Sequence, residues 1–168
     1  MEIKRVIVGF LEENCYIVTK NNKTVIIDPG DDANQIINAC INKNVVGVLI
    51  THHHFDHIGA LKKIEKYFNI LEGNCPNIGF ETIKNPGHSK DSASYYFKEE
   101  KVLFCGDFIF KDSIGRTDLE TGSDKDMINS LKMLSKYPDD LVLYPGHGDK
   151  TILGHEKSNF KYYYKELN

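Results

Sequence analysis

The feature that most constrains this chain is a cluster of histidines directly after an apolar segment. Residues 45–50, Val-Val-Gly-Val-Leu-Ile, are apolar throughout, as expected for a strand covered on both faces. The sequence Thr51-His52-His53-His54-Phe55-Asp56-His57 follows. Over residues 58–68 apolar side chains then recur every three or four positions, which predicts a helix. The chain must therefore fold so that several imidazoles gather in one strand-to-helix loop.

Imidazole and carboxylate groups at this spacing suit a first-row divalent metal ion. Zinc accepts both kinds of ligand at about 2.0–2.2 Å, and iron and manganese accept the same set. In extended backbone alternate side chains point the same way, so we expect His52 and His54 to share one ion. His53 then points elsewhere, and we expect it at the surface.

Three more candidates stand where predicted strands end, each directly after a glycine: His88, Asp107 and His147. Glycine allows close backbone approach and positive φ. Taken singly, a histidine or aspartate at such a turn is more often structural than functional. Together with the cluster, however, they provide five histidines and two aspartates, which is enough for two metal ions.

The remaining pattern predicts alternating strands and helices. We expect strands over residues 2–8, 15–19, 24–27, 45–50, 78–83, 92–97, 101–105 and 141–144. Helices are expected after Asp31 and Asp32, over 58–68, after Ser123 and over 154–167. This order favours an α+β fold of mixed sheets covered by helices over a bundle or an all-β barrel.

Length and composition narrow the class of protein. The 168 residues indicate one domain. A net charge of −3, without a long block of one sign, argues against nucleic acid or an anionic membrane as partner. No apolar run is long enough to cross a membrane, and the first ten residues do not read as a secretory signal. We therefore expect a cytoplasmic protein with reduced thiols at Cys15, Cys40, Cys75 and Cys105.

The order of these motifs resembles the metallo-β-lactamase superfamily, and within it the glyoxalase II-like (hydroxyacylglutathione hydrolase-like) hydrolases. The matching segments are residues 8–10, 14–16, 27–30, 51–57, 85–89, 106–107, 115–119, 145–148 and 151–156. The resemblance implies a four-layer αββα sandwich, with two mixed sheets flanked by helices and the metals at one edge between them. It also implies a single domain over residues 1–168.

The same resemblance assigns roles to individual residues. It implies that one ion is held by His52, His54 and His88, that a second is held by Asp56, His57 and His147, and that Asp107 bridges them. Asp28 is expected to orient a ligand imidazole from behind. Arg116 and Asp118 lie in a loop that the resemblance places near the substrate, although an internal Arg–Asp pair is an equal alternative. We expect Cys105 to be a buried thiol and His155 to be exposed.

The expected activity is hydrolysis of an acyl thioester, such as S-D-lactoylglutathione, by a hydroxide bridging two divalent ions, most simply zinc. Asp56 would help to orient that hydroxide. Only residues 148–168 follow His147, too few for the helical domain that binds glutathione in glyoxalase II, so the true thioester need not contain glutathione. The stretch between His57 and His88 is also shorter than usual for these hydrolases.

Two alternatives belong to other classes. Persulfide dioxygenases resemble this family but hold one iron through two histidines and an aspartate. A non-catalytic metal-binding module is the second alternative, because the short stretch between His57 and His88 could remove the substrate pocket. The filled set of seven ligand positions favours the dinuclear hydrolase over the dioxygenase.

Overall fold

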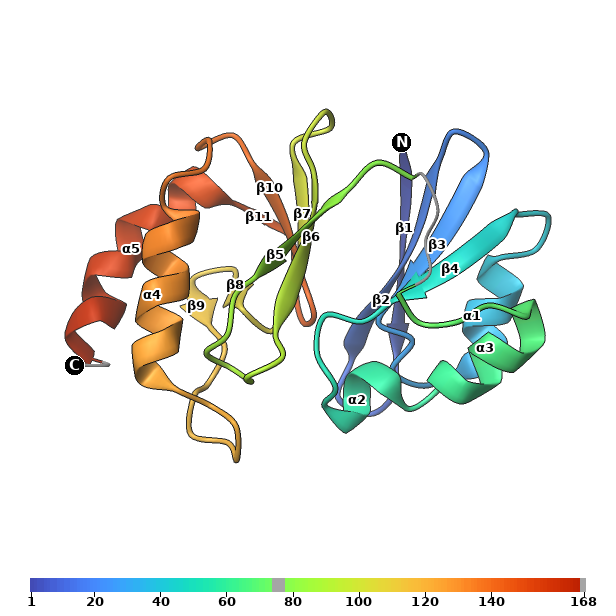
Figure 1. Ribbon diagram of the computed structural model, residues 1–168, viewed down its shortest axis with the longest axis horizontal. Helices are drawn as coiled ribbons and strands as arrows, with labels where there is room; N and C mark the ends of the chain where they lie inside the picture. Colours follow the sequence, from blue (N-terminus) through green and yellow to red (C-terminus); the bar gives the residue numbers. More distant parts are fainter. Residues whose placement is uncertain (74–77, 167–168) are drawn as a thin grey trace. The chain divides into compact units, whose positions relative to one another are not determined.

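The computed structural model describes residues 1–73 and 78–166. The predictions for Cys75 and Leu167 lie outside this part. The chain forms two compact units, residues 1–79 and 80–168 (Figure 1). A single domain over both stays a prediction.

The first unit is built on a four-stranded mixed sheet. Its strands are β1 (Glu2–Val8), β2 (Glu13–Lys20), β3 (Lys23–Ile27) and β4 (Val45–Leu49), in that order across the sheet. The first three form an antiparallel meander, and β4 runs parallel to β3 after the crossover helix α1 (Ala33–Ala39). Two helices follow β4: α2 (Phe55–Ile58) and α3 (Leu61–Phe68).

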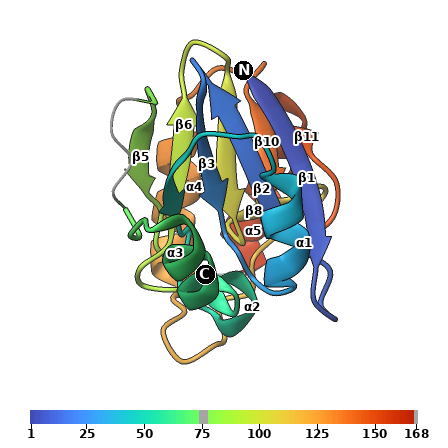
Figure 2. The same cartoon turned by 90° about the vertical axis from the view of Figure 1, so that its right-hand side faces the viewer.

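Helices α1 and α3 cover one face of this sheet (Figure 2). The apolar side chains between them form one core cluster, which includes Val6, Ile17, Ile26, Val48, Ile36 and Ile64. Each side chain in it comes from alternate strand positions or from one helical face, as the sequence periodicity requires. The expected helix over residues 58–68 is interrupted at Gly59 and Ala60, because the Ala60 N–H donates to the Pro29 carbonyl at 3.0 Å instead of continuing from α2.

The start of α1 differs from the prediction in one contact. Asp32 occupies the N-cap position, but its side chain makes no cap hydrogen bond. Its Oδ2 instead accepts from the Gly9 N–H at 3.0 Å, in the turn between β1 and β2. The Asp32 carboxylate, which the sequence predicts as a helix cap, therefore makes a tertiary contact instead.

The second unit repeats this plan with a five-stranded mixed sheet. Its elements are β5 (Glu81–Lys84), β6 (Ala93–Phe97), β7 (Val102–Gly106), β8 (Ile109–Phe110), β9 (Ser113–Ile114), α4 (Asp124–Leu134), β10 (Val142–Pro145), β11 (Thr151–Ile152) and α5 (Leu153–Glu166). The sheet order is β11-β10-β7-β6-β5, and β10 runs parallel to β7. Strands β8 and β9 form a separate hairpin.

Helices α4 and α5 pack on one face of this sheet, over a core that includes Leu103, Met127, Leu131, Leu143, Leu153 and Phe160 (Figure 1). Tyr163 and Tyr164 pack against the same core. The predicted start of α4 is confirmed, since the Ser123 side chain accepts from the Asp126 N–H. Strands β8, β9 and β11 were not predicted, because each has only two residues and therefore shows no periodicity.

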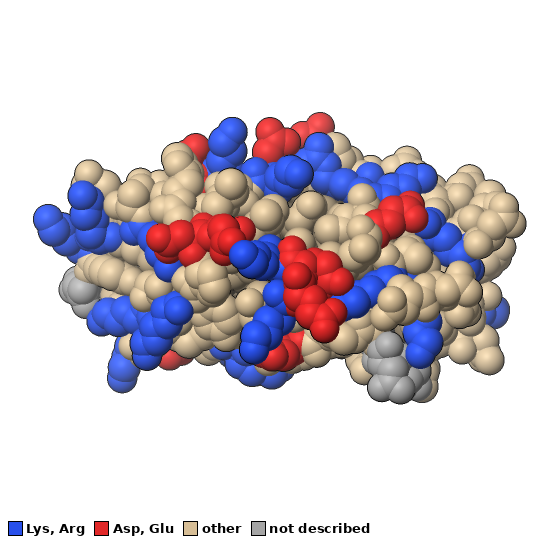
Figure 3. All heavy atoms as spheres, turned by 90° about the horizontal axis from the view of Figure 1, so that it is seen from above, with Lys and Arg blue, Asp and Glu red and all other residues tan. Residues whose placement is uncertain are grey.

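The structure confirms the α+β class with two mixed sheets, each covered by helices. Among residues 1–73 and 78–166, no helix is long and apolar enough to cross a membrane. Cys15, Cys40 and Cys105 are buried thiols. Cationic and anionic side chains are interspersed over the face shown in Figure 3.

Candidate metal centre

In the first unit, two neighbouring parallel strands end at one edge of the sheet and place Asp28 beside Thr51. The Asp28 N–H donates to the Leu49 carbonyl at 3.0 Å, directly after β3. Both Asp28 carboxylate oxygens then accept from Thr51, Oδ1 from the backbone N–H at 2.7 Å and Oδ2 from the hydroxyl at 2.6 Å. These bonds fix the buried carboxylate at the end of the strand.

The same carboxylate orients His57, which lies on α2 and is fully buried. His57 Nδ1 is 3.0 Å from Asp28 Oδ2, so we assign the ring proton to Nδ1. Its Nε2 atom faces Asp56, whose Oδ2 is 3.7 Å away. An imidazole that donates one N–H to a carboxylate and turns its other nitrogen toward a second potential ligand has the arrangement of a metal ligand.

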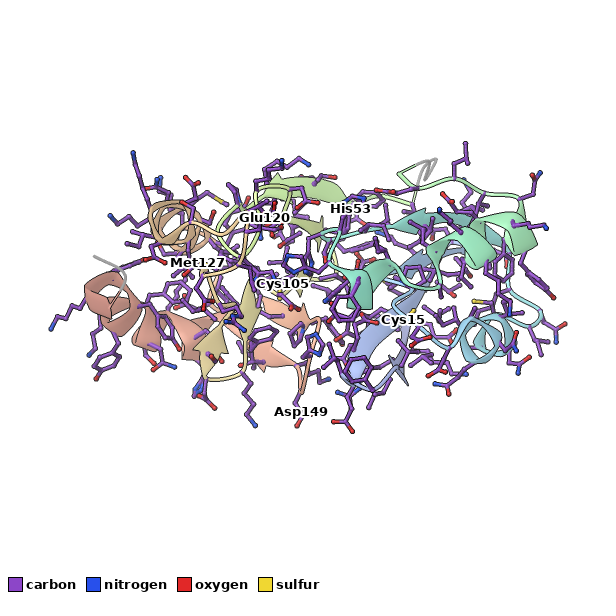
Figure 4. All side chains as sticks on the ribbon, turned by 90° about the horizontal axis from the view of Figure 1, so that it is seen from below. Cys15, His53, Cys105, Glu120, Met127 and Asp149 are labelled. Carbon is purple, nitrogen blue, oxygen red and sulfur yellow. The ribbon has the colours of Figure 1, made fainter. Side chains whose placement is uncertain are left out.

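His52 and His54 converge as predicted. His52 Nε2 lies 3.1 Å from His54 Nδ1. His52 Nδ1 is 3.2 Å from the Thr51 hydroxyl, which already donates to Asp28 and therefore accepts here. His53 points away, with half of its side chain exposed and its Nε2 atom 3.1 Å from Glu72 (Figure 4).

Negative charge accumulates behind this cluster. Glu13, Asp28 and His57 each offer one atom within 4.8 Å of the others, and all three are buried. The nearby Cys15 thiol (Figure 4) has its pKa raised well above its usual range, first by burial and then by the charges of Glu13 and Asp28. Neutral imidazoles do not compensate these carboxylates, whereas a divalent cation would.

In the second unit, His88 is held by the backbone. It lies between β5 and β6, and its Nδ1 atom is 2.8 Å from the Arg116 carbonyl, so we assign the proton to Nδ1 here as well. Its Nε2 atom is 3.6 Å from Asp107 Oδ2. The preceding Gly87 is required, because a Cβ there would lie 2.6 Å from the Met127 Cα on α4.

Asp107 and His147 follow the neighbouring parallel strands β7 and β10. Gly106 ends β7 with a φ of +50°, which turns the chain into Asp107. His147 Nε2 lies 3.7 Å from Asp107 Oδ2. Asp107 therefore faces His88 and His147 with the same oxygen.

The donor spacing inside each unit fits a divalent ion. Two ligands of one tetrahedral zinc ion lie ~3.4 Å apart at ordinary bond lengths. The separations of 3.6–3.7 Å between imidazole nitrogen and carboxylate oxygen are close to that value and too long for good hydrogen bonds. These His and Asp groups therefore indicate divalent metal ions.

Arg116 and Asp118 form an exposed bidentate pair, with Arg116 Nε and Nη2 donating to the two Asp118 oxygens at 2.6 and 2.7 Å. The hydrogen bond from Arg116 lowers the pKa of Asp118 to about 2. This is the pairing that the sequence offered as the alternative to substrate contact. A role for either residue toward a substrate stays a prediction.

Two other predictions concern residues outside the donor sets. Cys105 is buried as expected, with its thiol donating to the Ile109 carbonyl at 3.3 Å (Figure 4). His155 is exposed as expected, but it also bonds Asp112, with 2.6 Å between Nε2 and Oδ1. No spacing pattern pointed to Asp112, because the two residues lie on separate elements.

The sequence also missed a pocket beside Asp56. It has a volume of about 260 Å³ and is lined by residues of the first unit: Val8, Gly9, Phe10, Leu11, Gly30, Asp31, Phe55, Asp56 and Gly59. The exposed rings of Phe10 and Phe55 stack with their centroids 6.5 Å apart. Exposed aromatic side chains around a concave site mark a place where apolar groups bind.

Comparisons with known proteins agree with this geometry. The family model described as the metallo-beta-lactamase superfamily matches residues 8–85 and 71–147. A relative from Bacillus subtilis, the probable metallo-hydrolase YqgX, is 29% identical over 90% of this chain and 92% of its own. The hydroxyacylglutathione hydrolase GloC of Haemophilus influenzae is 28% identical over 94% of this chain and 95% of its own.

Solved structures give the same fold. The B3 metallo-beta-lactamase BLEG-1 superposes with a TM-score of 0.86 at 29% identity, covering 96% of this chain and 99% of its own. TTHA1623, solved in a di-iron-bound form, superposes with a TM-score of 0.85 at 28% identity, covering 91% of this chain and 96% of its own. ETHE1 from Myxococcus xanthus superposes with a TM-score of 0.78 at 23% identity, covering 94% of this chain and 82% of its own. At this identity it shows the fold alone. This chain therefore belongs to the metallo-β-lactamase superfamily, and its relatives identify it, at that coarse level, as a metal-dependent hydrolase.

Proposed function

We propose that this protein is a dinuclear metal hydrolase of acyl thioesters. The ligands would be His52, His54 and His88 for one ion, Asp56, His57 and His147 for the other, and Asp107 between them. The observation that carries the proposal is the shared orientation of three imidazoles. His52, His57 and His88 each direct Nδ1 to an oxygen acceptor and turn Nε2 toward another candidate ligand.

The chain's own residues would prepare the reaction. When bound, two divalent ions supply an activated water and polarise the carbonyl under attack. Asp28 holds the His57 ring in one tautomer, and the Arg116 carbonyl does the same for His88. Asp56, only partly buried, presents a carboxylate that orients the attacking water. Zinc is the ion we propose, and the di-iron relative makes iron the first alternative.

The substrate class rests on two observations. The apolar pocket bordered by Phe10, Phe55 and Asp56 suits the acyl part of a thioester. The relative GloC is named for hydrolysis of hydroxyacylglutathione, which is a thioester. We therefore propose a small-molecule thioester as the partner of this site, with S-D-lactoylglutathione as the first compound to assay.

The test is a metal count combined with a panel of acyl thioesters. We expect about two ions per chain and measurable kcat/KM for at least one thioester. Asp56→Ala and Asp107→Ala should each lower kcat/KM by roughly a thousandfold or more, because each removes a charged group from the reacting centre. Asp149→Ala, an exposed position near His147, is the control and should retain activity. Equal residual activity in all four proteins would support a non-catalytic module.

A mono-iron persulfide dioxygenase is the second candidate, because TTHA1623, which has the same fold, was solved in a di-iron-bound form. It predicts one iron per chain and oxygen uptake with a persulfide, while thioesters stay intact. That result would overturn the hydrolase proposal.

A further inference from the structure

One buried acidic residue has no part in the chemistry above. Glu13 is the first residue of β2, and its side chain is 1% exposed. Carboxylates are seldom buried this fully unless a partner or an ion compensates the charge. The groups around the Glu13 carboxylate therefore indicate the role of its charge.

Glu13 lies directly behind His57. Its Oε1 atom is 3.8 Å from His57 Nδ1, the same nitrogen that Asp28 contacts at 3.0 Å. Its Oε2 atom lies against Gly30, where a Cβ would approach it to 2.7 Å and the Asp56 carbonyl to 1.7 Å. Glu13 is therefore wedged between the turn that carries Asp28 and the helix that carries Asp56 and His57.

This position makes Glu13 a second negative charge behind one imidazole. Asp28 alone already accepts from both Thr51 donors and from His57, so a second carboxylate is not needed to set the tautomer. Two like charges repel each other when they are buried close together, which destabilises the metal-free protein. A cation bound through His57 reverses the sign of that effect, because both carboxylates then attract it across a region with little solvent screening.

We propose that Glu13 is a positioning residue whose charge, acting through His57, raises the affinity of this site for a divalent ion. The inference rests on the proposed function only in taking His57 as a metal ligand. It differs from the role of Asp28, which holds the ring by a hydrogen bond. Glu13 contributes charge from a position behind His57 and against Gly30.

The test compares Glu13→Gln with Glu12→Gln, which removes the same charge from the adjacent, exposed position. Metal-free protein is titrated with zinc against a chelating dye, and thermal unfolding is followed with and without zinc. We expect Glu13→Gln to weaken zinc binding roughly tenfold, within the range for groups behind a ligand histidine. We also expect it to unfold, without metal, at the same temperature as wild type or higher. Glu12→Gln should match wild type in both measurements.

Glu13→Asp sharpens the result, because it keeps the charge on a shorter side chain. It should bind zinc more tightly than Glu13→Gln. Unchanged zinc affinity in Glu13→Gln, or failure of the metal-free variant to fold, would overturn the proposal and assign a structural role. A wild-type protein that binds zinc but hydrolyses no thioester would refute the proposed function and leave this comparison intact.

Discussion

The two units of this protein share one order of elements but use it differently. Each has three antiparallel strands, a crossover helix and a strand parallel to the third: β1-β2-β3-α1-β4 in the first unit and β5-β6-β7-α4-β10 in the second, which adds the β8–β9 hairpin before α4. An aspartate follows the third strand in both, Asp28 after β3 and Asp107 after β7. Asp28 is buried and bonded behind His57, whereas Asp107 faces His88 and His147 directly.

The units also differ in what holds their histidines. A carboxylate orients His57, and a neutral backbone carbonyl orients His88. The first unit thus places negative charge behind one candidate ligand, His57, while the second holds its candidate ligand His88 through a backbone carbonyl. The comparison teaches that one plan of strands and helices supports both ways of preparing a metal site.

The two units share one packing feature, a glycine that lies against the backbone carbonyl of an aspartate. A Cβ at Gly30 would meet the Asp56 carbonyl oxygen at 1.7 Å, and one at Gly115 would meet the Asp107 carbonyl oxygen at 1.8 Å. Backbone cannot move aside cheaply, so Gly30→Ala and Gly115→Ala should each lower the free energy of unfolding by about 3 kcal/mol. Urea unfolding measures this effect, which is the largest change in stability that we predict.

Gly73→Ala is the control for this pair. Gly73 has a φ of +73°, and no atom of residues 1–73 or 78–166 lies within 4 Å of a Cβ built there, so only conformational strain of about 1 kcal/mol is expected. If Gly115→Ala lowered the free energy of unfolding no more than this control, while Gly30→Ala lowered it by the full amount, the close glycine packing would be essential in the first unit alone.

The next prediction tests the difference between the two orienting groups. Asp28→Asn removes a charge and an acceptor from His57 and should weaken zinc binding 10- to 100-fold. Arg116→Ala leaves the carbonyl that holds His88 in place, so it should change zinc affinity less than about twofold. Competition with a chelating dye measures both. A tenfold loss in Arg116→Ala would mean that the exposed side chain, and not the backbone carbonyl, supports the candidate ligand His88.

Much of this architecture was predictable because it depends on local pattern. The β-branched residues of 2–8 and the continuous apolar run over 45–50 predicted β1 and β4 almost to the residue. Alternation in extended backbone predicted that His52 and His54 converge while His53 points away. The spacing of Ser123 and Asp126 predicted the cap of α4.

What escaped prediction depends on contacts between distant segments. The break between α2 and α3 comes from the Pro29 carbonyl, and the Asp32 side chain is bound by the Gly9 N–H. Glu13 carried no signal, because a charged residue at the start of a strand usually faces solvent. Its burial beside His57 depends on how the turn after β3 meets α2, and local sequence does not encode that meeting.

The smallest effect we predict concerns an exposed histidine–acid pair in each unit, His53 with Glu72 and His155 with Asp112. The hydrogen bond to Asp112 raises the pKa of His155, with the charges of Glu156 and Asp112 adding to it. Because this pKa is higher in the folded state, the protonated pair stabilises the protein fully below about pH 6.5, the usual histidine pKa. That contribution disappears as the pH rises through the raised value.

Urea unfolding of metal-free protein between pH 5.5 and 8.5 isolates this contribution as the difference between wild type and His155→Gln. We expect wild type to have the higher urea midpoint at the acid end and the two midpoints to converge at the alkaline end. His53→Gln is the matched control, because it removes an exposed imidazole of the other unit, whose contact with Glu72 is 3.1 Å long compared with 2.6 Å for His155. A constant gap for His155→Gln across this range would show that the pair stabilises the second unit without depending on its proton.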